Sequence, residues 1–354
     1  MSKIVVTGGA GFVGSTLCIQ LKQKYPNYEI IAFDNLKRRG SELNLKDFQQ
    51  LGIPFVHGDI RNNEDLLALG AFDVLIEASA EPSVTAGLDS DPTYVINNNL
   101  YGSINCFNAC LQHKAKLIFL STSRVYPIEA IENAFFVEDN TRFAFDEKQT
   151  ERGISKLGIS ENLTLYGARS FYGTTKLSSE MFIQEYSVFY GLKAAITRFG
   201  VIAGPRQMGK TDQGVVTLWM AKHYWKQTLK YIGYGGTGKQ VRDILHVDDL
   251  VDLIDLQIHE IEKFSGKIFN VGGGLENSAS LLEMTAICEK ITGNKIIIGS
   301  EIETRPADLR LYITDNSLIE KEIGWKPKKS VETIFTDIFN WIKENEKELE
   351  SILK

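Results

Sequence analysis

Residues 7–14 read Thr-Gly-Gly-Ala-Gly-Phe-Val-Gly, and this glycine-rich stretch decides the fold. It follows the apolar run 4–6 and leads into a segment whose apolar side chains recur with helical spacing. Gly8 permits a tight turn, Gly11 lets the backbone approach a pyrophosphate, and Gly14 lets the helix pack closely on the strand. The start of the helix then supplies amide donors and a positive dipole for the phosphates. The stretch therefore predicts a strand, loop and helix that bind a dinucleotide.

An acidic residue stands at the distance where a ribose is recognised. Asp34 follows the second apolar run, residues 29–33, and lies twenty residues after Gly14. A carboxylate there hydrogen-bonds a ribose diol and repels a ribose phosphate, so the sequence favours NAD over NADP. The basic residues 37–39 weaken this preference, because they could meet a phosphate.

Tyr172 and Lys176 stand four residues apart in the sequence Tyr-Gly-Thr-Thr-Lys. On a helix this spacing puts the phenol and the ammonium on one face, about one turn apart. A free phenol titrates near pH ~10, too high for a base at neutral pH, but a nearby cation favours the phenolate. Such pairs also arise by chance on solvated helix faces. Together with the glycine-rich loop, the pair predicts a general acid/base.

The composition is that of an enzyme with a large core. The 354 residues exceed one ordinary domain, so we expect two lobes that share a cleft, and 43% of the residues are apolar. The net charge of −6 argues against a nucleic-acid surface. No apolar stretch reaches membrane-spanning length, and the first strand begins almost at once, so we expect neither a membrane segment nor a signal peptide.

The metal-binding and disulfide-forming residue types show no clustering in the sequence. The four cysteines lack any Cys-x-x-Cys pairing, which predicts buried free thiols in a reducing cytoplasm. The five histidines are scattered, so no metal site is expected.

Strand-like and helical runs alternate along the first half of the chain. Helical stretches include 100–113 and 176–189. Such alternation implies parallel strands joined by helical crossovers, and hence an α/β protein with a doubly wound Rossmann sheet. The strand-like runs are residues 4–6, 29–33, 55–57, 74–76, 117–120 and 194–197.

Beyond Arg198 the pattern loosens into glycine-rich turns, short strands and separate helices. It ends in an expected helix over 330–353, where Ile334, Ile338 and Ile342 recur at four-residue spacing. We therefore expect an NAD-binding Rossmann domain and a smaller C-terminal lobe that binds the substrate. The expected boundaries are 1–180 with a return segment at about 240–262 for the first, and 181–239 with 263–354 for the second.

Hydroxyl side chains end the fifth strand, in Leu-Ser-Thr-Ser-Arg-Val-Tyr at 120–126. With the glycine-rich loop, Asp34 and the tyrosine–lysine pair, the chain resembles the extended short-chain dehydrogenase/reductase family of nucleotide-sugar enzymes over almost its whole length. Members place a Ser or Thr four residues before the tyrosine of a Val-Tyr pair, here Tyr126. The resemblance therefore favours Thr122 over Ser123 as the hydroxyl that meets the substrate.

Further stretches resemble the part of that family that holds the cofactor. They are His-Gly-Asp-Ile-Arg at 57–61, Ala-Ser-Ala at 78–80 and Asn-Leu-Tyr-Gly-Ser at 99–103. In the family, the Asp and the Ile of the first stretch meet the adenine. The cofactor residues implied by the loop, the acid and the resemblance are Gly8, Gly11, Phe12, Val13, Asp34, Asn35, Asp59, Ile60, Ala78, Ala80, Asn99, Tyr172 and Lys176.

The C-terminal lobe carries the resemblance to the substrate site. Residues 238–249 match the pattern Gly-x-Gln-x-Arg-Asp-x-x-His-Val-x-Asp, whose arginine, here Arg242, clamps a pyrophosphate in the family. Arg305 matches the second phosphate arginine. Either arginine could instead be a surface ion-pair residue. The implied substrate residues are Thr85, Arg206, Gln207, Gln240, Arg242, Arg305 and Asp308.

Four stretches, 206–207, 212–214, 238–243 and 269–273, most resemble the subfamily that epimerises carbon 2 of CDP-hexoses of the CDP-paratose and CDP-tyvelose type. One departure separates the chain from the dehydratase relatives. Thr122 is followed by Ser-Arg, not by the Asp-Glu pair that those relatives use as acid and base.

The resemblance thus implies an NAD-dependent epimerase of a nucleotide-diphosphate hexose, with Thr122, Tyr172 and Lys176 as catalytic residues. A homo-oligomer, either dimer or tetramer, is expected. Three alternatives stay open: a UDP-sugar 4-epimerase, an NAD(P)-dependent reductase or dehydrogenase of nucleotide sugars, and a noncatalytic NAD-binding regulator.

Overall fold

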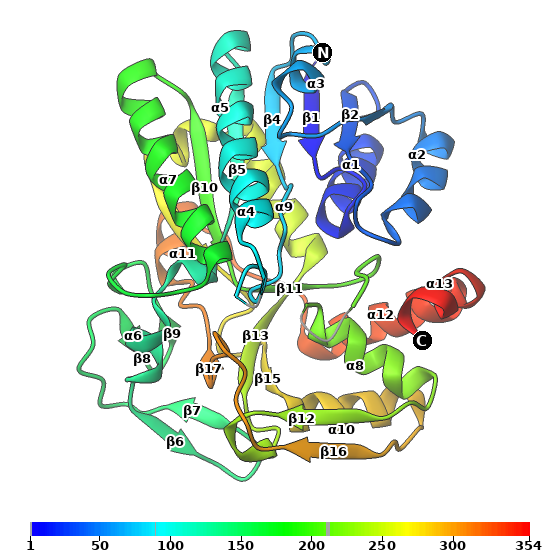
Figure 1. Ribbon diagram of the computed structural model, residues 1–354, viewed down its shortest axis with the longest axis vertical. Coiled ribbons are helices and arrows are strands. Elements are labelled where there is room, and N and C mark those ends of the chain that lie inside the picture. The colour runs from blue at the N-terminus through cyan, green and yellow to red at the C-terminus, as the bar shows by residue number, and fades with distance from the viewer. Residues whose placement is uncertain (1, 89, 210–212) are drawn as a thin grey trace. The chain divides into compact units, whose positions relative to one another are not determined.

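A computed structural model of the chain describes residues 2–88, 90–209 and 213–354 (Figure 1). The chain divides into two compact units. Unit 1 contains Met1–Thr122, Phe171–Arg198 and Leu250–Ile268, and unit 2 contains Ser123–Ser170, Phe199–Asp249 and Phe269–Lys354. Residues 123–170 therefore group with unit 2, whereas the expected boundary at residue 180 would place them in the Rossmann domain.

A seven-stranded sheet has the order β14-β10-β5-β4-β1-β2-β3. The neighbouring pairs among β3, β2, β1, β4 and β5 are parallel. Strand β1 has β2 on one side and β4 on the other, so the strand order reverses there, and doubly wound sheets bind ligands at such a switch point. The predicted Rossmann sheet is confirmed. Its strands are β1 (Lys3–Thr7), β2 (Glu29–Asp34), β3 (Phe55–His57), β4 (Val74–Glu77), β5 (Lys116–Thr122), β10 (Ala194–Phe199) and β14 (Ile268–Val271).

Two helices differ from the expected ranges: α5 begins later as an α-helix, and α7 begins earlier. The run expected from residue 100 starts as a π-helical turn, Asn97–Tyr101, and becomes α-helical only at Gly102. Helix α7 begins at Phe171, so Tyr172 and Lys176 both lie inside it. The helices that lie wholly or mostly in unit 1 are α1 (Phe12–Lys24), α2 (Leu45–Leu51), α3 (Asn63–Leu67), α4 (Thr93–Ile96), α5 (Gly102–His113), α7 (Phe171–Tyr190) and α9 (Val247–His259).

A buried apolar cluster fixes helices α5 and α7 to the sheet. Phe33 and Phe119 from the strands pack with Cys106 and Phe107 of α5 and with Ile183 of α7. The rings of Phe107 and Phe119 meet edge to face, with centroids 6.0 Å apart. Because α7 is held in this way, the side chains near its start have fixed positions relative to the carboxyl ends of β4 and β5.

Unit 2 is built around a smaller sheet. Strand β13 lies between β11 and β15 and also pairs with β17. Helices α8, α10 and α12 pack on one another. Two-stranded ribbons pair β6 with β7, β8 with β9, and β12 with β16. The strands are β6 (Phe136–Glu138), β7 (Phe143–Phe145), β8 (Ile154–Ser155), β9 (Gly158–Ile159), β11 (Val201–Ala203), β12 (Leu229–Ile232), β13 (Val241–His246), β15 (Ser278–Ser280), β16 (Ile298–Glu301) and β17 (Leu311–Tyr312), and the helices are α6 (Ile128–Glu132), α8 (Val215–Tyr224), α10 (Leu281–Thr292), α11 (Ser317–Ile323), α12 (Val331–Glu344) and α13 (Glu346–Leu353).

The single C-terminal helix expected over 330–353 is wrong. It is broken between α12 and α13 at Asn345, whose φ of −116° and ψ of 24° are not helical. The Asn345 side chain donates from Nδ2 to the carbonyl of Trp341 at 2.9 Å, which offers the backbone an alternative to continuing the helix. The apolar face predicted at Ile334, Ile338 and Ile342 is confirmed, because all three are fully buried.

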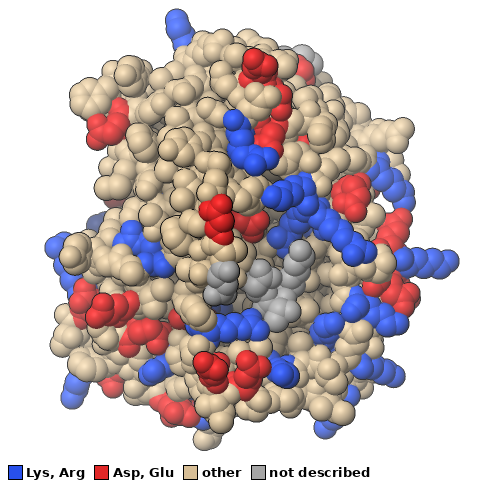
Figure 2. All heavy atoms as spheres, viewed as in Figure 1, with Lys and Arg blue, Asp and Glu red and all other residues tan. Residues whose placement is uncertain are grey.

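The surface and the thiols agree with the composition. Cys18, Cys106, Cys110 and Cys288 are buried and free, as predicted. Lys and Arg side chains are interspersed with Asp and Glu on the face that Figure 2 draws. Among the described residues, no helix combines the length and the apolar character needed to cross a bilayer, and no group of three His, Cys, Asp or Glu side chains is arranged to hold a metal ion.

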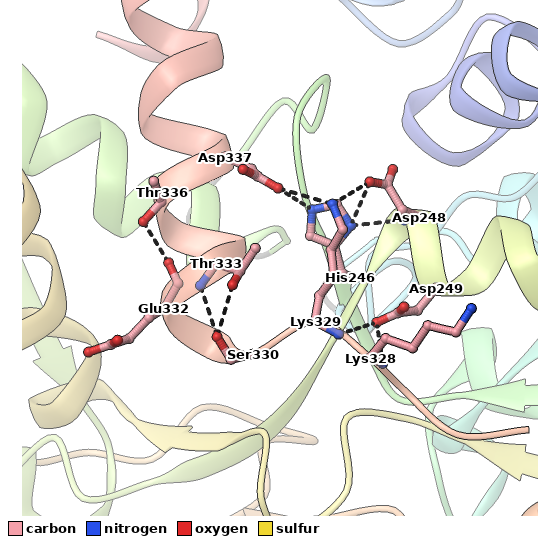
Figure 3. Close-up of polar contacts among 10 residues, drawn as sticks. All are labelled: His246, Asp248, Asp249, Lys328, Lys329, Ser330, Glu332, Thr333, Thr336 and Asp337. Atoms are coloured by element: carbon pink, nitrogen blue, oxygen red, sulfur yellow. Dashed lines mark hydrogen bonds and ion pairs between the residues drawn. The ribbon is translucent and has the colours of Figure 1, made fainter.

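A polar cluster in unit 2 attaches α12 to the end of β13. His246 is buried, its Nδ1 accepts the backbone N–H of Asp248 at 2.9 Å, and its Nε2 lies 3.2 Å from Asp337 Oδ2. Lys329 Nζ bridges the carboxylates of Asp248 and Asp337, at 2.6 and 3.2 Å. Figure 3 shows the His246 ring between those two carboxylates, with Asp337 reaching it from α12. Burial lowers the pKa of His246, although both carboxylates oppose the shift.

This cluster predicts a pH-dependent stability. The folded-state pKa of His246 lies below the unfolded value of ~6.5, so the unfolded chain binds more protons as the pH falls. The free energy of unfolding in urea is therefore expected to fall between about pH 7.5 and pH 5.5. The slope should be smaller in His246→Asn, and unchanged in the control His57→Asn, whose side chain is exposed. An equal slope in His246→Asn and the unmutated protein would show that His246 does not carry the effect.

Candidate active site

The glycine-rich loop between β1 and α1 is packed so closely that side chains would not fit. Gly8 has a φ of +65°, and a Cβ on it would lie 2.8 Å from the carbonyl oxygen of Ala78. A Cβ on Gly14 would lie 2.1 Å from the carbonyl oxygen of Gly8. The first glycine thus makes the turn that L side chains rarely adopt, and the last lets the helix start against the loop.

The start of α1 has the properties of a phosphate site. Its N-cap, Gly11, makes no side-chain capping bond, and no acidic residue lies in the first turn. A Cβ added to Gly11 would meet only a carbonyl oxygen at 3.1 Å. The amides of Phe12 and Val13, at the first two helical positions, need a partner from outside the helix. These residues fit the pyrophosphate of a dinucleotide.

Asp34 joins the end of β2 to this loop. Its carboxylate accepts the N–H of Ala10 at 3.1 Å and the N–H of Leu36 at 2.7 Å. Burial raises the pKa of Asp34, and these backbone donors oppose the shift. Asp34 ends β2 next to the glycine-rich loop, which is where dinucleotide-binding folds place the acid that meets a ribose diol. Nearby, Lys37 Nζ lies 3.0 Å from the centroid of the Tyr94 ring, so this cation is already engaged.

Asn35, Asp59 and Arg61 form a polar group at the ends of β2 and β3. Asn35 Nδ2 donates to Asp59 Oδ2 at 2.9 Å, and Arg61 binds both Asp59 oxygens at 2.7 and 2.9 Å. The Arg61 guanidinium holds the pKa of Asp59 well below its usual range. Ile60 beside them is buried, and its side chain packs on Gly102. Asp59 is thus ionised at neutral pH, and its two oxygens already accept four hydrogen bonds, three from Arg61 and one from Asn35.

Asn99 uses its whole side chain to hold the loop after β4. Its Oδ1 accepts the N–H of Glu81 at 2.7 Å, and its Nδ2 donates to the Glu81 carbonyl at 2.9 Å. The Asn99 carbonyl accepts the hydroxyl of Ser179 on α7 at 3.3 Å. Asn99 therefore links this loop to α7, and the loop carries Ala78 and Ala80, both half-buried.

The tyrosine–lysine pair lies in the first turns of α7, as predicted. Tyr172 is half-buried, whereas Lys176 is 2% exposed, and its Nζ lies 3.2 Å from Oε2 of the fully buried Glu77. Thr122 ends β5 and is buried. The strand register places Glu77 beside both Thr7 and Phe119. Unit 1 thus gathers the loop and the lysine at the carboxyl ends of neighbouring strands, with Thr122 ending the strand beside Glu77.

A second buried ion pair fixes the next turn of α7. Glu180 lies one turn after Lys176, and its carboxylate accepts from Arg198 of β10 and from the Ser121 hydroxyl at the end of β5. Glu77, Glu180 and Arg198 belong to none of the motifs that predicted the site. A carboxylate that ends an apolar strand was a visible signal for Glu77, but nothing in the sequence named its partner.

In unit 2 the structure brings together two of the predicted substrate residues. Arg242 Nη2 donates to Asp308 Oδ1 at 2.8 Å and to the Leu309 carbonyl at 2.7 Å. The Arg242 guanidinium thus makes an ion pair within the chain, and its side chain is 13% exposed and that of Asp308 26%. Burial raises the pKa of Tyr234, helped by Glu132 and Asp308 and opposed by Arg242.

The other predicted substrate residues each have different contact partners. Gln240 is buried and donates to the Ile232 carbonyl at 2.6 Å, and Gln207 donates to the Ile202 carbonyl at 2.9 Å, so both amides support the fold. Arg206 has a φ of +74°, an uncommon value for a residue with a side chain. The remaining members are Thr85, whose hydroxyl lies 3.1 Å from that of Ser83, and Arg305, which is half-buried. Asp212, in the stretch 212–214 quoted for the subfamily resemblance, lies outside the described residues.

Sequence comparison places the chain among nucleotide-sugar enzymes. The profile of the NAD dependent epimerase/dehydratase family matches residues 4–272. A CDP-paratose 2-epimerase from Salmonella typhi is 31% identical over 348 residues, which cover 96% of this chain and 98% of that protein. A bifunctional UDP-glucose 4-epimerase and UDP-xylose 4-epimerase 1 from Pisum sativum is 29% identical, with 97% of this chain and 96% of that protein covered.

A solved structure agrees in fold over the whole length. The UDP-glucuronic acid 4-epimerase from Bacillus cereus, in complex with UDP-glucuronic acid and NAD, superposes with a TM-score of 0.78 at 25% identity. The match covers 97% of this chain and 99% of that chain.

Proposed function

The chain belongs to the NAD dependent epimerase/dehydratase family and is an NAD-dependent enzyme; from this premise we propose that it epimerises carbon 2 of a CDP-hexose of the CDP-paratose and CDP-tyvelose type. The observation that carries the proposal is the similarity to a CDP-paratose 2-epimerase over nearly the whole of both chains. The buried hydroxyl of Thr122 and the placement of Tyr172 and Lys176 in α7 support the chemistry.

Three side chains of this chain move or hold the reacting atoms. Tyr172, as the phenolate, takes the proton of the sugar hydroxyl while the hydrogen on the same carbon leaves as a hydride. Lys176 favours the phenolate by its charge, and Thr122 orients the reacting oxygen. Bound NAD supplies the hydride-accepting and hydride-returning chemistry. The flat keto sugar turns over, Tyr172 returns its proton, and no net redox change results.

We assign the cofactor to unit 1 and the nucleotide sugar chiefly to unit 2. The loop amides at Phe12 and Val13 would hold the pyrophosphate, and Asp34 would hold the adenosine ribose. Asp59, held in place by Asn35 and Arg61, and Ile60 would lie beside the adenine. In unit 2, Arg242 and Arg305 would clamp the diphosphate of the sugar nucleotide, because a guanidinium fork suits phosphate oxygens. Thr85, Arg206, Gln207, Gln240 and Asp308 complete the proposed substrate set.

The proposed substrate is tested by turnover. The purified protein is incubated with CDP-, UDP-, GDP- and dTDP-hexoses, and the products are analysed by NMR for inversion at each sugar carbon. We expect inversion at carbon 2, and chiefly with CDP-hexoses. Inversion at carbon 4 of a UDP-hexose would replace this substrate, while stoichiometric consumption of added NAD(P)H would indicate a reductase.

A UDP-sugar 4-epimerase is the second candidate. It is favoured by the relative from Pisum sativum and by the solved structure from Bacillus cereus, which both act at carbon 4 by their names. The catalytic side chains would have the same roles, so only the carbon that is inverted and the preferred base separate the two candidates.

We further propose a cytoplasmic homo-oligomer. The free buried thiols support a reducing compartment. Helix α7 exposes Met181, Val188, Phe189 and Tyr190, an apolar surface suited to a second copy. In light scattering we expect a dimer or tetramer, and Met181→Glu with Phe189→Glu should yield monomers. A monomeric unmutated protein would contradict this proposal.

A further inference from the structure

Glu77 occupies a central place in unit 1. It is the last residue of β4, it is fully buried, and its neighbours in register are Thr7 on β1 and Phe119 on β5. Thr7 directly precedes Gly8 of the glycine-rich loop, and Thr122 lies three residues after Phe119. A carboxylate here ends a strand that is otherwise apolar, so packing alone does not account for it.

The carboxylate of Glu77 has a single charged partner in the contacts of the described residues, and that partner is Lys176. Oε2 lies 3.2 Å from Lys176 Nζ, whereas Oε1 is buried with no hydrogen-bond partner within the part of the chain that the structure describes. The same ammonium lies 4.4 Å from the centroid of the Phe119 ring. The Lys176 side chain is thus fixed from β4 and β5 as well as by its own helix.

The other titratable groups around this pair do not neutralise Lys176. The thiol of Cys106, from α5, stays protonated because burial raises its pKa well above the usual value. Glu180 is one turn further along α7, and its charge is balanced by Arg198. Tyr172 is one turn before Lys176 on the same helix. Burial raises the pKa of Glu77 itself, and the Lys176 ammonium opposes this shift. Glu77 is therefore the carboxylate that balances the buried lysine.

We propose that Glu77 is a positioning residue of the reaction, which holds the Lys176 ammonium charged and in place so that Tyr172 can act as the phenolate. The inference deepens the proposed function and rests on it, since it assumes that Tyr172 and Lys176 act as described there. An ammonium that is buried without a counter-charge gives up its proton more easily, because a low-dielectric surrounding disfavours the charged form. A neutral acceptor at position 77 could keep the hydrogen bond but not the charge.

The test compares Glu77→Gln with Glu77→Asp. Glutamine preserves the size and one acceptor but removes the charge, and aspartate preserves the charge on a shorter side chain. Glu185→Gln is the matched control, because it removes an exposed carboxylate from α7 itself. The pH dependence of kcat/KM is measured for each variant with the best substrate of the nucleotide-sugar panel.

The alkaline limb of the pH profile of kcat/KM is expected to move to lower pH in Glu77→Gln. Each pH unit of this shift lowers kcat/KM at alkaline pH about tenfold. Glu77→Asp should be slower but keep the limb of the unmutated enzyme, and Glu185→Gln should change neither. A rate that falls by one factor at every pH in Glu77→Gln would show a merely structural role and overturn the proposal.

A second measurement needs no substrate, so it separates this proposal from the proposed function. The thermal unfolding midpoint of Glu77→Gln should lie below that of the unmutated protein at neutral pH, and the deficit should shrink as the pH approaches ~10, where an unpaired lysine loses its charge. Adding Lys176→Met to Glu77→Gln should remove the deficit at neutral pH. A deficit that is independent of pH and of Lys176 would overturn the role of Glu77, whether or not the protein turns over any sugar.

Discussion

Replacing Tyr172 with phenylalanine is expected to lower turnover by ~100-fold or more, the usual scale for losing a general acid/base. The substitution removes the phenolic oxygen that we propose takes the sugar hydroxyl proton, and it leaves the ring in place. Since the arginines proposed to bind the phosphates belong to unit 2, the affinity for the nucleotide sugar should survive. The measurement is kcat from initial rates, with affinity from calorimetry on the same samples.

Tyr166→Phe is the matched control for this substitution. It makes the same chemical change at a tyrosine that is 91% exposed. Unchanged turnover in Tyr166→Phe beside a large loss in Tyr172→Phe assigns the effect to the site. Near-normal turnover in Tyr172→Phe would exclude Tyr172 as the acid/base.

The second large effect is expected at the phosphate arginines. Arg242→Ala should weaken binding of the nucleotide sugar by about 2–3 kcal/mol, as is typical when a charge-assisted contact is lost. Arg305→Ala should act similarly. The content of NAD in the purified variants should stay the same, because the proposed cofactor residues lie in unit 1. Calorimetric titration and mass spectrometry of the extracted cofactor measure the two quantities.

Lys239→Ala is the control, and it tests whether the loss of any basic residue in this stretch weakens binding of the nucleotide sugar. Lys239 lies three residues before Arg242 and is paired with the exposed Glu138 at 2.8 Å, so its loss should change affinity little. If Arg242→Ala and Arg305→Ala both leave substrate affinity unaltered, the two arginines are surface ion-pair residues. In that case the function of Arg242 is the ion pair with Asp308 that the structure shows.

Local patterns predicted the Rossmann part of the fold well, because its signals are short-range. The close approach of Gly8 and Gly14 and the buried runs of β1, β2 and β4 are properties of neighbouring residues. The break at Asn345 was missed because the apolar spacing continues on both sides of it. The break is accompanied by a side-chain bond from Asn345 to the Trp341 carbonyl, which apolar spacing does not reveal.

The site was predictable where its residues follow a motif and hidden where they depend on tertiary pairing. Tyr172 and Lys176 share a helix, so their spacing already indicated their common face. Glu77 is 99 positions from Lys176 in the chain, and the packing of α7 against the sheet brings them together. Burial of a charged pair is visible only once the strands are assembled, because isolated Glu and Lys residues predict exposed positions.

The central claim is that hydride leaves and returns at one carbon, and isotope labelling tests it most directly. A CDP-hexose that carries deuterium at carbon 2 is incubated with the enzyme in ordinary water, and the unlabelled sugar is incubated in heavy water. We predict that the 2-epimer keeps its deuterium in the first experiment and gains none at carbon 2 in the second, since a hydride held in the site does not exchange with solvent. Loss of the label to water, or uptake of solvent deuterium at carbon 2, would contradict the account, because the carbon would then be inverted through an enol.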